Sequence, residues 1–316
     1  MDLKRLKLAI YPLFMCMPLA LSSAIAKPYI IPENSCIGLA DEIIFNQDKV
    51  NTITYMRSYN KDAAENIHPD YRVIFLAGKI VQSDQFVTDS YRLSNTTKYS
   101  YDSRMNLSTT QYYHIGSDER LELTDQRIYN YDNMNRMLGW DEKDFYSSPP
   151  IESYKLTCEY DNDKEYIKSS KYTLIFKDVA PNFAIFHIDG SGRLLSYTKL
   201  IPQSAANIRD GVGGKILTEL DFIYSDKNSL YPARININNY DFLSEGTKPS
   251  GYIVFDSLGR EIGGSIDALG ETYEIQYTEI DKFGNWLKKT TIRTYEDAEE
   301  NTTDIIFRKI IYSTTK

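Results

Sequence analysis

The chain has few of the residues that most often carry catalysis or bind metals. Its 316 residues include three histidines, three cysteines and two tryptophans. The histidines, His68, His114 and His187, stand far apart in the sequence, so none belongs to an H-x-x-x-H or H-E-x-x-H zinc pattern. We therefore predict no metal site and place each histidine in a loop or a strand.

The usual patterns of nucleophiles and phosphate loops are also missing. No G-x-S-x-G motif is present, and Ser196 and Lys199, which match S-x-x-K in letters, fall in a strand-like stretch that turns them to opposite faces. The stretch 209–215 lacks the first glycine and the closing Ser or Thr of a phosphate loop. Residues 161–165 offer carboxylates without the glycine turn of a calcium loop. We predict no catalytic residue and no cofactor, which favours a protein that is not an enzyme.

Long hydrophobic runs are confined to the first residues. Lys4, Arg5 and Lys7 precede an apolar stretch at 8–21, which is too short to cross a membrane comfortably. Ala24-Ile25-Ala26 follows as a small-x-small cleavage site, so residues 1–26 are predicted to be a bacterial signal peptide cleaved after Ala26. The alternative is a short membrane anchor that the mature protein retains.

The predicted mature chain is acidic. Cleavage removes three basic residues and one acidic residue, so the formal charge changes from −8 to −10. An acidic exported protein is a poor partner for nucleic acid or for anionic membrane surfaces. No later segment is apolar enough to cross a membrane as a helix, and we expect a periplasmic or secreted protein.

Only two cysteines follow the predicted cleavage site. Cys36 and Cys158 would be the only thiols in an oxidising compartment, which predicts one disulfide bond that closes a long loop. Two free buried thiols are the alternative.

Helical periodicity is absent, and alternation of apolar and polar residues takes its place. The polar stretch DKFGNW lies between two alternating segments, 271–280 and 286–295, and a third such segment follows at 304–313. Asp281 suits the start of a turn, and Gly284 stands where a hairpin loop needs a positive φ. We predict a mainly β protein of antiparallel tandem β-hairpins, forming an extended or curled meander sheet with little helix.

The same turn pattern recurs upstream. Clear copies pair an aspartate with a glycine or asparagine three residues later: Asp132 with Asn135, Asp189 with Gly192, and Asp256 with Gly259. Looser copies begin at Asp102, Asp161 and Asp226, and the gaps between successive aspartates range from 25 to 37 residues. One hairpin per unit predicts a repeat domain at 96–316, with residues 27–95 as an N-terminal β cap over its first edge.

These units resemble the YD repeat of Rhs-type bacterial cell-surface proteins. The matching residues are Tyr131-Asp132-Asn135-Arg136, Asp189-Gly192-Arg193-Leu194, Asp256-Gly259-Arg260 and Asp281-Gly284-Asn285-Trp286. The resemblance covers about residues 96–316. It implies display at the cell surface or a shell around other polypeptides, and it transfers no catalytic residue.

Tyrosine is unusually abundant, with 26 copies beside 13 phenylalanines. Exposed aromatic side chains on a sheet can bind a protein or glycan partner, and Trp140 and Trp286, each beside a turn, are the predicted anchors. Ordinary cross-strand packing of aromatic residues is the alternative. The sequence thus favours an exported, non-catalytic protein with a binding or scaffolding role. An accessory or immunity-type protein that binds one secreted polypeptide, and an envelope hydrolase with scattered carboxylates, are the alternatives.

Overall fold

A computed structural model of the chain describes residues 49–58, 67–87, 92–116, 118–160, 166–174, 182–189, 193–241, 246–296 and 301–313. The predicted signal peptide, Cys36, Asp161 and Gly192 lie outside these residues, so the predictions that depend on them stay predictions. The first described residues enter a strand directly. No helix in the described part of the chain is both long and apolar enough to cross a membrane.

The described residues are almost entirely β-strand, as the alternating pattern predicts. One short helix, α1 (Ala205–Arg209), and a 3-10 turn at Asp267–Leu269 interrupt the strands. The strands are β1 (Val50–Ser58), β2 (Ile67–Leu76), β3 (Lys79–Phe86), β4 (Leu93–Tyr101), β5 (Leu107–Ile115), β6 (Leu121–Tyr131), β7 (Met137–Asp144), β8 (Ile151–Tyr160), β9 (Tyr166–Leu174), β10 (Asn182–Ile188), β11 (Leu194–Leu200), β12 (Ile216–Ile223), β13 (Arg234–Asp241), β14 (Gly246–Phe255), β15 (Glu261–Ile266), β16 (Glu271–Ile280), β17 (Trp286–Tyr295) and β18 (Thr302–Tyr312).

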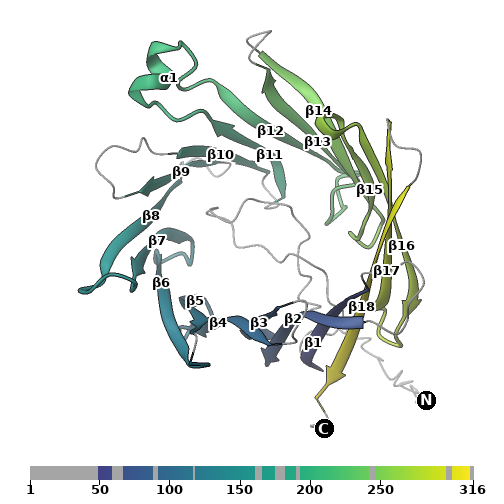
Figure 1. Cartoon of the computed structure of the whole chain (residues 1–316). Coiled ribbons are helices and arrows are strands. Elements are labelled where there is room, and N and C mark those ends of the chain that lie inside the picture. Colours follow the sequence, from purple (N-terminus) through teal and green to yellow (C-terminus); the bar gives the residue numbers. More distant parts are fainter. Residues whose placement is uncertain are drawn as a thin grey trace, which may run out of the picture.

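The strands form one antiparallel meander that returns to its start. Each strand pairs with the next one along the chain, and β1 pairs with both β2 and β18. The β1–β18 register runs from Val50 opposite Tyr312 to Ser58 opposite Ile305. The sheet therefore curls into a closed ring (Figure 1). Strands β1 to β3, from the segment predicted as a cap, are members of this same sheet, and β1 covers the edge of β18 by pairing with it.

The up-and-down order separates two kinds of connection. Turns that follow even-numbered strands all lie on one rim of the ring. This rim carries the Asp-x-x-Gly or Asp-x-x-Asn units that begin at Asp132, Asp189, Asp256 and Asp281, and the looser unit that begins at Asp102, with Met105 in the fourth position. We call it the motif rim. Both ends of the described chain also lie there, where the Ser313 amide donates to the Lys49 carbonyl at 2.7 Å. Connections after odd-numbered strands form the opposite rim.

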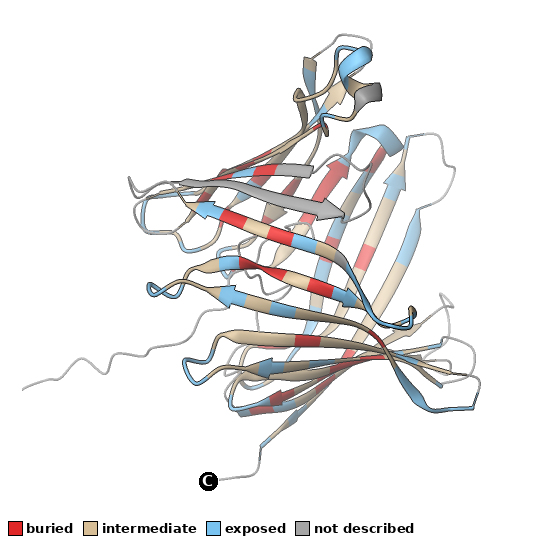
Figure 2. Cartoon of the chain, turned by 90° about the vertical axis from the view of Figure 1, so that its left-hand side faces the viewer, coloured by how far each residue is buried: buried red, intermediate tan, exposed pale blue. Residues whose placement is uncertain are grey.

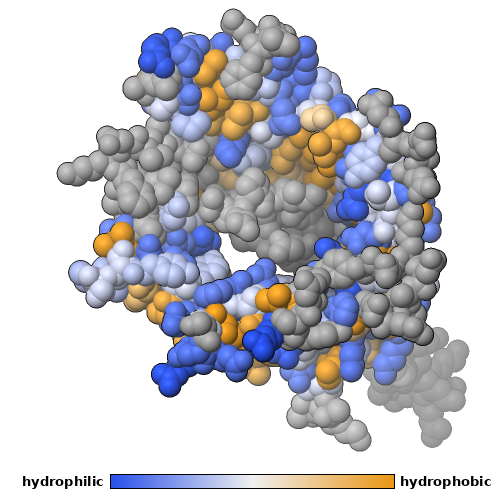
Figure 3. All heavy atoms as spheres, in the orientation of Figure 1, coloured by the Kyte–Doolittle hydropathy of each residue, from blue (hydrophilic) through white to orange (hydrophobic). Residues whose placement is uncertain are grey.

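Buried residues alternate along the strands with more exposed ones (Figure 2). A large buried cluster extends from β7 to β14, and a small one lies where β1, β2 and β18 meet. The large cluster comprises Trp140, Leu156, Cys158, Ala184, Phe186, Leu194, Tyr197, Leu220, Phe222, Ile235, Ile253 and Phe255. The strand registers place these side chains on one face of the sheet. Because side chains converge on the concave face of a curved sheet, this buried face is the inner one. Figure 3 shows the ring hollowed at its centre, with hydrophobic residues gathered on the wall of the hollow toward β13 and β14.

A glycine allows close approach of two strands in this wall. Gly139 has φ +138°, and a Cβ atom built on it would lie 2.0 Å from the backbone oxygen of Leu156. No larger residue fits there without moving β8, so the position requires glycine.

Candidate functional site: turn staples and a tyrosine wall

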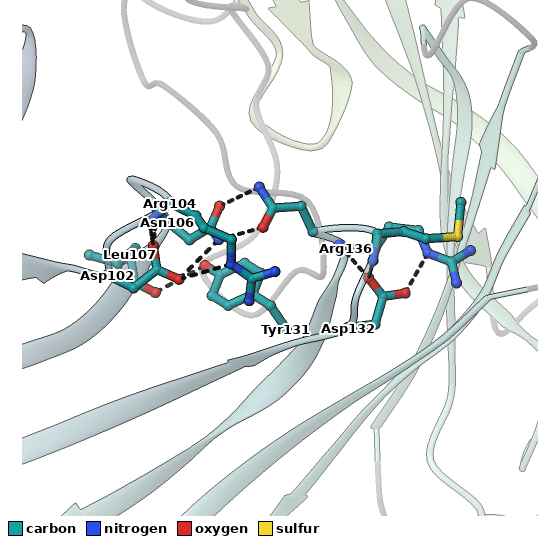
Figure 4. A network of polar contacts seen from close by, with 9 residues as sticks. Asp102, Arg104, Asn106, Leu107, Tyr131, Asp132 and Arg136 are labelled. Atoms are coloured by element: carbon teal, nitrogen blue, oxygen red, sulfur yellow. Dashed lines mark hydrogen bonds and ion pairs between the residues drawn. The ribbon is translucent and has the colours of Figure 1, made fainter.

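The aspartate of each repeat unit organises its own turn. In the unit at 132–136, Asp132 Oδ1 accepts hydrogen bonds from the amides of Met134 and Arg136 at 2.9 and 2.8 Å, and Oδ2 accepts one from Arg136 Nε at 2.7 Å (Figure 4). Asn135 takes φ +68° and donates its amide to the Asp132 carbonyl. The turn is thus closed by one carboxylate and one left-handed residue.

The other described units repeat this geometry with different residues. Gly259 and Gly284 have φ values of +75° and +91°, and Met105 takes +65° at the same position. Asp256 accepts from the amide and guanidinium of Arg260 as Asp132 does from those of Arg136. Adjacent turns also contact each other, because the side-chain amides of Asn106 and Asn135 exchange hydrogen bonds at 2.7 and 3.0 Å (Figure 4).

Hydrogen bonds from the turn lower the aspartate pKa. The backbone amide of Arg136 is the largest cause of the lowered pKa of Asp132. The backbone amide of Asn106 is the largest cause of the lowered pKa of Asp102. Both carboxylates are therefore held ionised. They act in the turn itself and are not poised to exchange protons near neutral pH.

Five of the hairpins are fastened to the preceding one by a tyrosine hydroxyl. The tyrosine lies near the end of a strand that leads to the motif rim, and it donates to the carbonyl of a residue close behind the preceding turn. We call this contact a turn staple. The staples are Tyr101 to Ile80 at 2.8 Å, Tyr131 to Leu107 at 3.0 Å, Tyr160 to Met137 at 2.8 Å, Tyr224 to Leu194 at 3.0 Å and Tyr277 to Glu261 at 2.9 Å.

The arginine of the unit strengthens the staple. Arg136, Arg193 and Arg260 lie 4.5, 4.7 and 5.1 Å from the ring centres of the next stapling tyrosines, Tyr160, Tyr224 and Tyr277. A guanidinium over an aromatic face is attracted by the ring electrons. The Tyr-Asp and Gly-Arg parts of the motif therefore contact each other between successive hairpins.

The last hairpin is fastened by a different residue. Arg308 of β18 is 3 % exposed, donates from Nε to the Trp286 carbonyl at 2.8 Å and lies 4.1 Å from the Trp286 ring centre. An arginine here makes the contact to a backbone carbonyl that a tyrosine hydroxyl makes in the five staples.

A group of tyrosines covers the inner face of β2 to β6. Tyr71, Tyr99, Tyr101, Tyr112, Tyr129 and Tyr131 are half-buried, and we call them the tyrosine wall. The registers link them to the buried face, because Tyr129 lies opposite Trp140, and Tyr99 lies opposite Thr110, which in turn faces Arg127.

Hydroxyl groups of the wall have partners on the wall itself. Tyr99 Oη lies 3.2 Å from Ser83 Oγ, and Thr110 Oγ1 donates to Tyr129 Oη at the same distance. Burial is the largest cause that raises the pKa of Tyr99 and of Tyr131 to about 12. These hydroxyls stay protonated under ordinary conditions and can donate or accept hydrogen bonds.

A buried ion pair lies beside the wall. Arg127 Nε is 2.5 Å from Glu142 Oε2, and the guanidinium lies between the rings of Tyr112 and Trp140, at 5.2 and 4.4 Å from their centres. Glu142 is 4 % exposed. The two charges neutralise each other, so this part of the wall presents rings and little net charge.

The two tryptophans differ from their predicted role. Trp140 and Trp286 are 2 % and 4 % exposed, so neither ring projects from the sheet as an anchor for a partner. Trp140 belongs to the large cluster, and Trp286 packs against Tyr55 and Tyr277 at ring separations of 6.2 and 5.9 Å. Strand registers turn both side chains inward. Their proximity to a turn therefore did not indicate exposure.

The structure also shows where the other candidate catalytic and ligand-binding residues from the sequence lie. In loop 201–215, the amides of Val212, Gly213, Gly214 and Lys215 donate to carbonyls of the same loop, unlike the free amides of a phosphate loop. Ser196 and Lys199 lie on opposite faces of β11. His114 Nδ1 lies 3.0 Å from Asn95 Oδ1. Among the residues that the structure describes, no group of three or more His, Cys, Asp or Glu side chains is placed to hold a metal ion.

Sequence reasoning did not identify the staples, the wall or the Arg127–Glu142 pair. A signal for the staples was present, since Tyr precedes Asp at 101, 131 and 160, and Arg follows the turn at 136, 193 and 260. No local pattern brings Arg127 to Glu142, which lie on different strands.

Comparisons with known proteins give only distant structural similarities. No family model matches the chain, and no curated protein matches it. A porin-like protein from Bacteroides uniformis ATCC 8492 is 12 % identical, over 83 % of this chain and 96 % of its own, with a TM-score of 0.42. A porin-like protein from Bacteroides vulgatus ATCC 8482 is 13 % identical, over 84 % and 99 %, with a TM-score of 0.29. TcdB2-TccC3 is 12 % identical over 82 % of this chain, with a TM-score of 0.30, and the match spans only 16 % of that much longer chain. Identities and TM-scores this low say nothing about what this chain does.

Proposed function

We propose that this protein is exported, is not an enzyme, and binds an extended polypeptide on the tyrosine wall inside its ring. It would act as a scaffold or accessory protein in the bacterial envelope or outside the cell. The signal-like residues 1–26 support export, with cleavage after Ala26. The intact mass of secreted or periplasmic protein tests this part, and retention of residues 1–26 would contradict it.

The tyrosine wall is the observation that supports binding. Its half-buried rings offer apolar area on a concave surface, and its hydroxyls offer hydrogen bonds at the ring edges. Tyrosine supplies both kinds of contact at a low cost in side-chain entropy, which is why it is enriched at protein interfaces. The resemblance to YD repeats points in the same direction, because that family is expected to form shells around polypeptides.

Binding can be tested with variants of the wall. Tyr112→Leu and Tyr129→Leu keep an apolar side chain and remove the hydroxyl and ring, while Tyr146→Leu changes a residue that is 75 % exposed outside the wall. A partner captured from envelope or culture fractions is identified, purified and titrated against each folded variant. We expect each wall variant to lose about tenfold or more in affinity, as truncation of an interface aromatic does, and Tyr146→Leu to bind as wild type does.

Two results would overturn the proposal. Equal affinity of all three variants would place the partner elsewhere on the molecule. Hydrolytic turnover abolished by one Asp, Glu or His substitution would replace the binding function by the envelope hydrolase.

A further inference from the structure

We propose that the polypeptide bound on the tyrosine wall is basic, and that its lysine or arginine side chains lie against Glu122, Asp125 and Asp144 on the inner face of β6 and β7. This inference rests on the proposed function and names the chemistry of the partner. It concerns the end of the wall that lies toward the opposite rim.

The strand registers place the three carboxylates on the inner face, beside the wall. Asp125 lies opposite Tyr112 of the wall on one side and opposite Asp144 on the other. Glu122 lies opposite His114, which follows two residues after Tyr112 in β5. A register shift in this strand pair keeps Glu122 and Asp125 on the same face. Glu122 is exposed and the two aspartates are half-buried, so all three are open to a partner.

These carboxylates differ from others of the inner face in having no cationic partner. Three other inner-face acids are paired with arginine: Glu142 with Arg127 at 2.5 Å, Glu271 with Arg293 at 3.1 Å and Asp304 with Arg57 at 3.6 Å. Among the residues that the structure describes, none forms an ion pair with Glu122, Asp125 or Asp144. Arg120, near Glu122 in the sequence, is paired with Asp118 at 3.3 Å instead. This end of the wall therefore carries net negative charge at neutral pH.

Asp125 and Asp144 also repel each other. Residues directly opposite in an antiparallel pair have Cβ atoms about 4.5–5.5 Å apart, and like charges there destabilise the sheet. Asp144 Oδ1 accepts the amide of Tyr146 at 2.7 Å, which orients this carboxylate and leaves its charge in place. Because both side chains are half-buried, solvent screens the repulsion only in part. A cationic side chain bound between them would relieve a repulsion that the unbound fold retains.

The spacing of the carboxylates fits an extended chain. Tyr112 and His114, which face Asp125 and Glu122, are two residues apart, a separation of about 7 Å along the strand. Alternate side chains of an extended polypeptide point the same way and are separated by the same distance. Basic residues at alternate positions would thus meet Glu122 and the facing aspartates in turn, and the residues that follow would lie on the tyrosine rings.

A row of polar side chains at the same level offers hydrogen bonds to the main chain of such a partner. Asn95 Nδ2 donates to Gln85 Oε1 at 3.2 Å, and Asn95 Oδ1 lies 3.0 Å from His114 Nδ1. The row crosses β3, β4 and β5 on the inner face. Gln85 and His114 are exposed, and Gln85 Nε2 and His114 Nε2 are not used within the row. They can therefore contact peptide groups between the basic side chains.

Synthetic peptides test the inference on the purified full-length protein. Three peptides of about ten residues alternate valine with lysine, with glutamine or with glutamate, so that only the charge changes. Titration at about 20 mM and at about 500 mM salt measures each dissociation constant and its screening. At low salt we expect the lysine peptide to bind about tenfold more tightly than the glutamine peptide, and the glutamate peptide to bind more weakly than both. The differences should shrink at high salt.

Matched variants locate the charge effect. Asp125→Asn/Asp144→Asn removes two charges beside the wall, and Glu274→Gln/Glu279→Gln removes two from exposed residues of β16 that lie opposite Ile292 and Lys288. The first variant should bind the lysine and glutamine peptides within about twofold of each other, and the second should keep the tenfold preference. Because neutralising the facing aspartates ends their repulsion, the first variant should unfold at no lower a urea concentration than wild type. If it does not fold, the exposed Glu122→Gln gives the same comparison.

Equal affinity of wild type for the lysine and glutamine peptides would overturn the inference. A lysine preference that Asp125→Asn/Asp144→Asn retains would overturn it as well. The glutamine peptide separates this inference from the proposed function, because it carries no charge to meet the carboxylates. If Tyr112→Leu weakens binding of the glutamine peptide and lysine brings no gain, the wall binds a polypeptide that is not basic. Unchanged binding of the glutamine peptide by Tyr112→Leu would contradict the wall, and no binding of any peptide would overturn both proposals.

Discussion

A single backbone angle decides which residue stands in the fourth position of each turn. Gly284 has φ +91°, which a β-branched residue adopts only with strain. We expect Gly284→Val to lower the free energy of unfolding by about 1–3 kcal/mol. Gly284→Asn should cost much less, because asparagine tolerates this conformation and Asn135 occupies the equivalent position with φ +68°. Urea unfolding measures both, and equal losses would show that the positive φ is not the cause.

The reverse change is expected at Met105. Its φ of +65° places a non-glycine side chain in the left-handed region, and its side chain is 50 % exposed, so little packing depends on it. Met105→Gly should therefore raise the free energy of unfolding by about 0.5–1 kcal/mol. Arg104→Gly, one residue earlier in the same turn, lacks this strain and should not stabilise. If Arg104→Gly also stabilises the protein, relief of the positive φ is not the cause of the stability gained by Met105→Gly.

Local turn chemistry was predictable at this scale. Asp281 and Gly284 indicated their turn because the carboxylate and the glycine act within five residues of each other. Met105 gave no such indication, because methionine has no preference for a positive φ and only the surrounding hairpin imposes it.

At the scale of the hairpin, the stapling hydroxyl fastens one unit to the next. Tyr131→Phe keeps the ring and leaves the Leu107 carbonyl without this donor. The expected loss is about 1–2 kcal/mol of unfolding free energy. Tyr146→Phe removes a hydroxyl from a side chain that is 75 % exposed and should change stability by less than about 0.5 kcal/mol. Thermal or urea unfolding of the two variants, compared with wild type, measures how much the staple contributes to stability. Equally small losses in both variants would show that the staple does not stabilise the fold.

The turn aspartates should make the hairpins sensitive to acid. The pKa values of Asp102, Asp132 and Asp226 are lowered in the folded protein, chiefly by backbone amides that donate to the ionised form. A lowered folded pKa stabilises the protein above the ordinary aspartate pKa of about 3.9, and this stabilisation is lost as pH falls through the folded value. Urea midpoints should therefore drop between pH 5 and pH 3. Asp132→Asn cannot take up that proton, so the urea midpoint of this variant should depend less steeply on pH than that of wild type. An equally steep dependence in the variant would show that Asp132 does not contribute to the acid sensitivity.

Contacts between hairpins were only partly predictable. The alternating pattern gave the strands of 271–280 and 286–295 correctly, yet it did not say which face turns inward. Trp140 and Trp286 were for that reason expected in solvent. A register shift between Asn130 and Tyr131, opposite Gly139 and Met137, brings both Met137 and Trp140 to the packed side. Such an extra residue in a strand leaves no clear mark in the sequence.

At the scale of the whole molecule, the closure of the ring could not be predicted from local sequence patterns. Val50 and Tyr312 pair across almost the entire chain, and nothing in either strand specifies the other. Residues 27–95 lack the turn motif, so they were predicted to cap the first edge of the sheet, and β1, which lies in this segment, pairs with the edge of β18. Closure leaves no free strand edge in the pairing of the described strands, which removes the usual site of edge-to-edge aggregation.

The strand pair that closes the ring offers the final test. Ile53 of β1 is fully buried, lies opposite Ile310 of β18 and packs in the small cluster with Val73 and Phe75. Ile53→Ala should lower the free energy of unfolding by about 2–4 kcal/mol. Because both β2 and β18 pair with β1, hydrogen exchange should accelerate in all three strands together. Ile311→Ala, on the neighbouring position of β18 whose side chain is 48 % exposed, is the matched control and should leave exchange nearly unchanged. Acceleration confined to β1 and β2, with β18 protected as in wild type, would show that β18 does not depend on its pairing with β1.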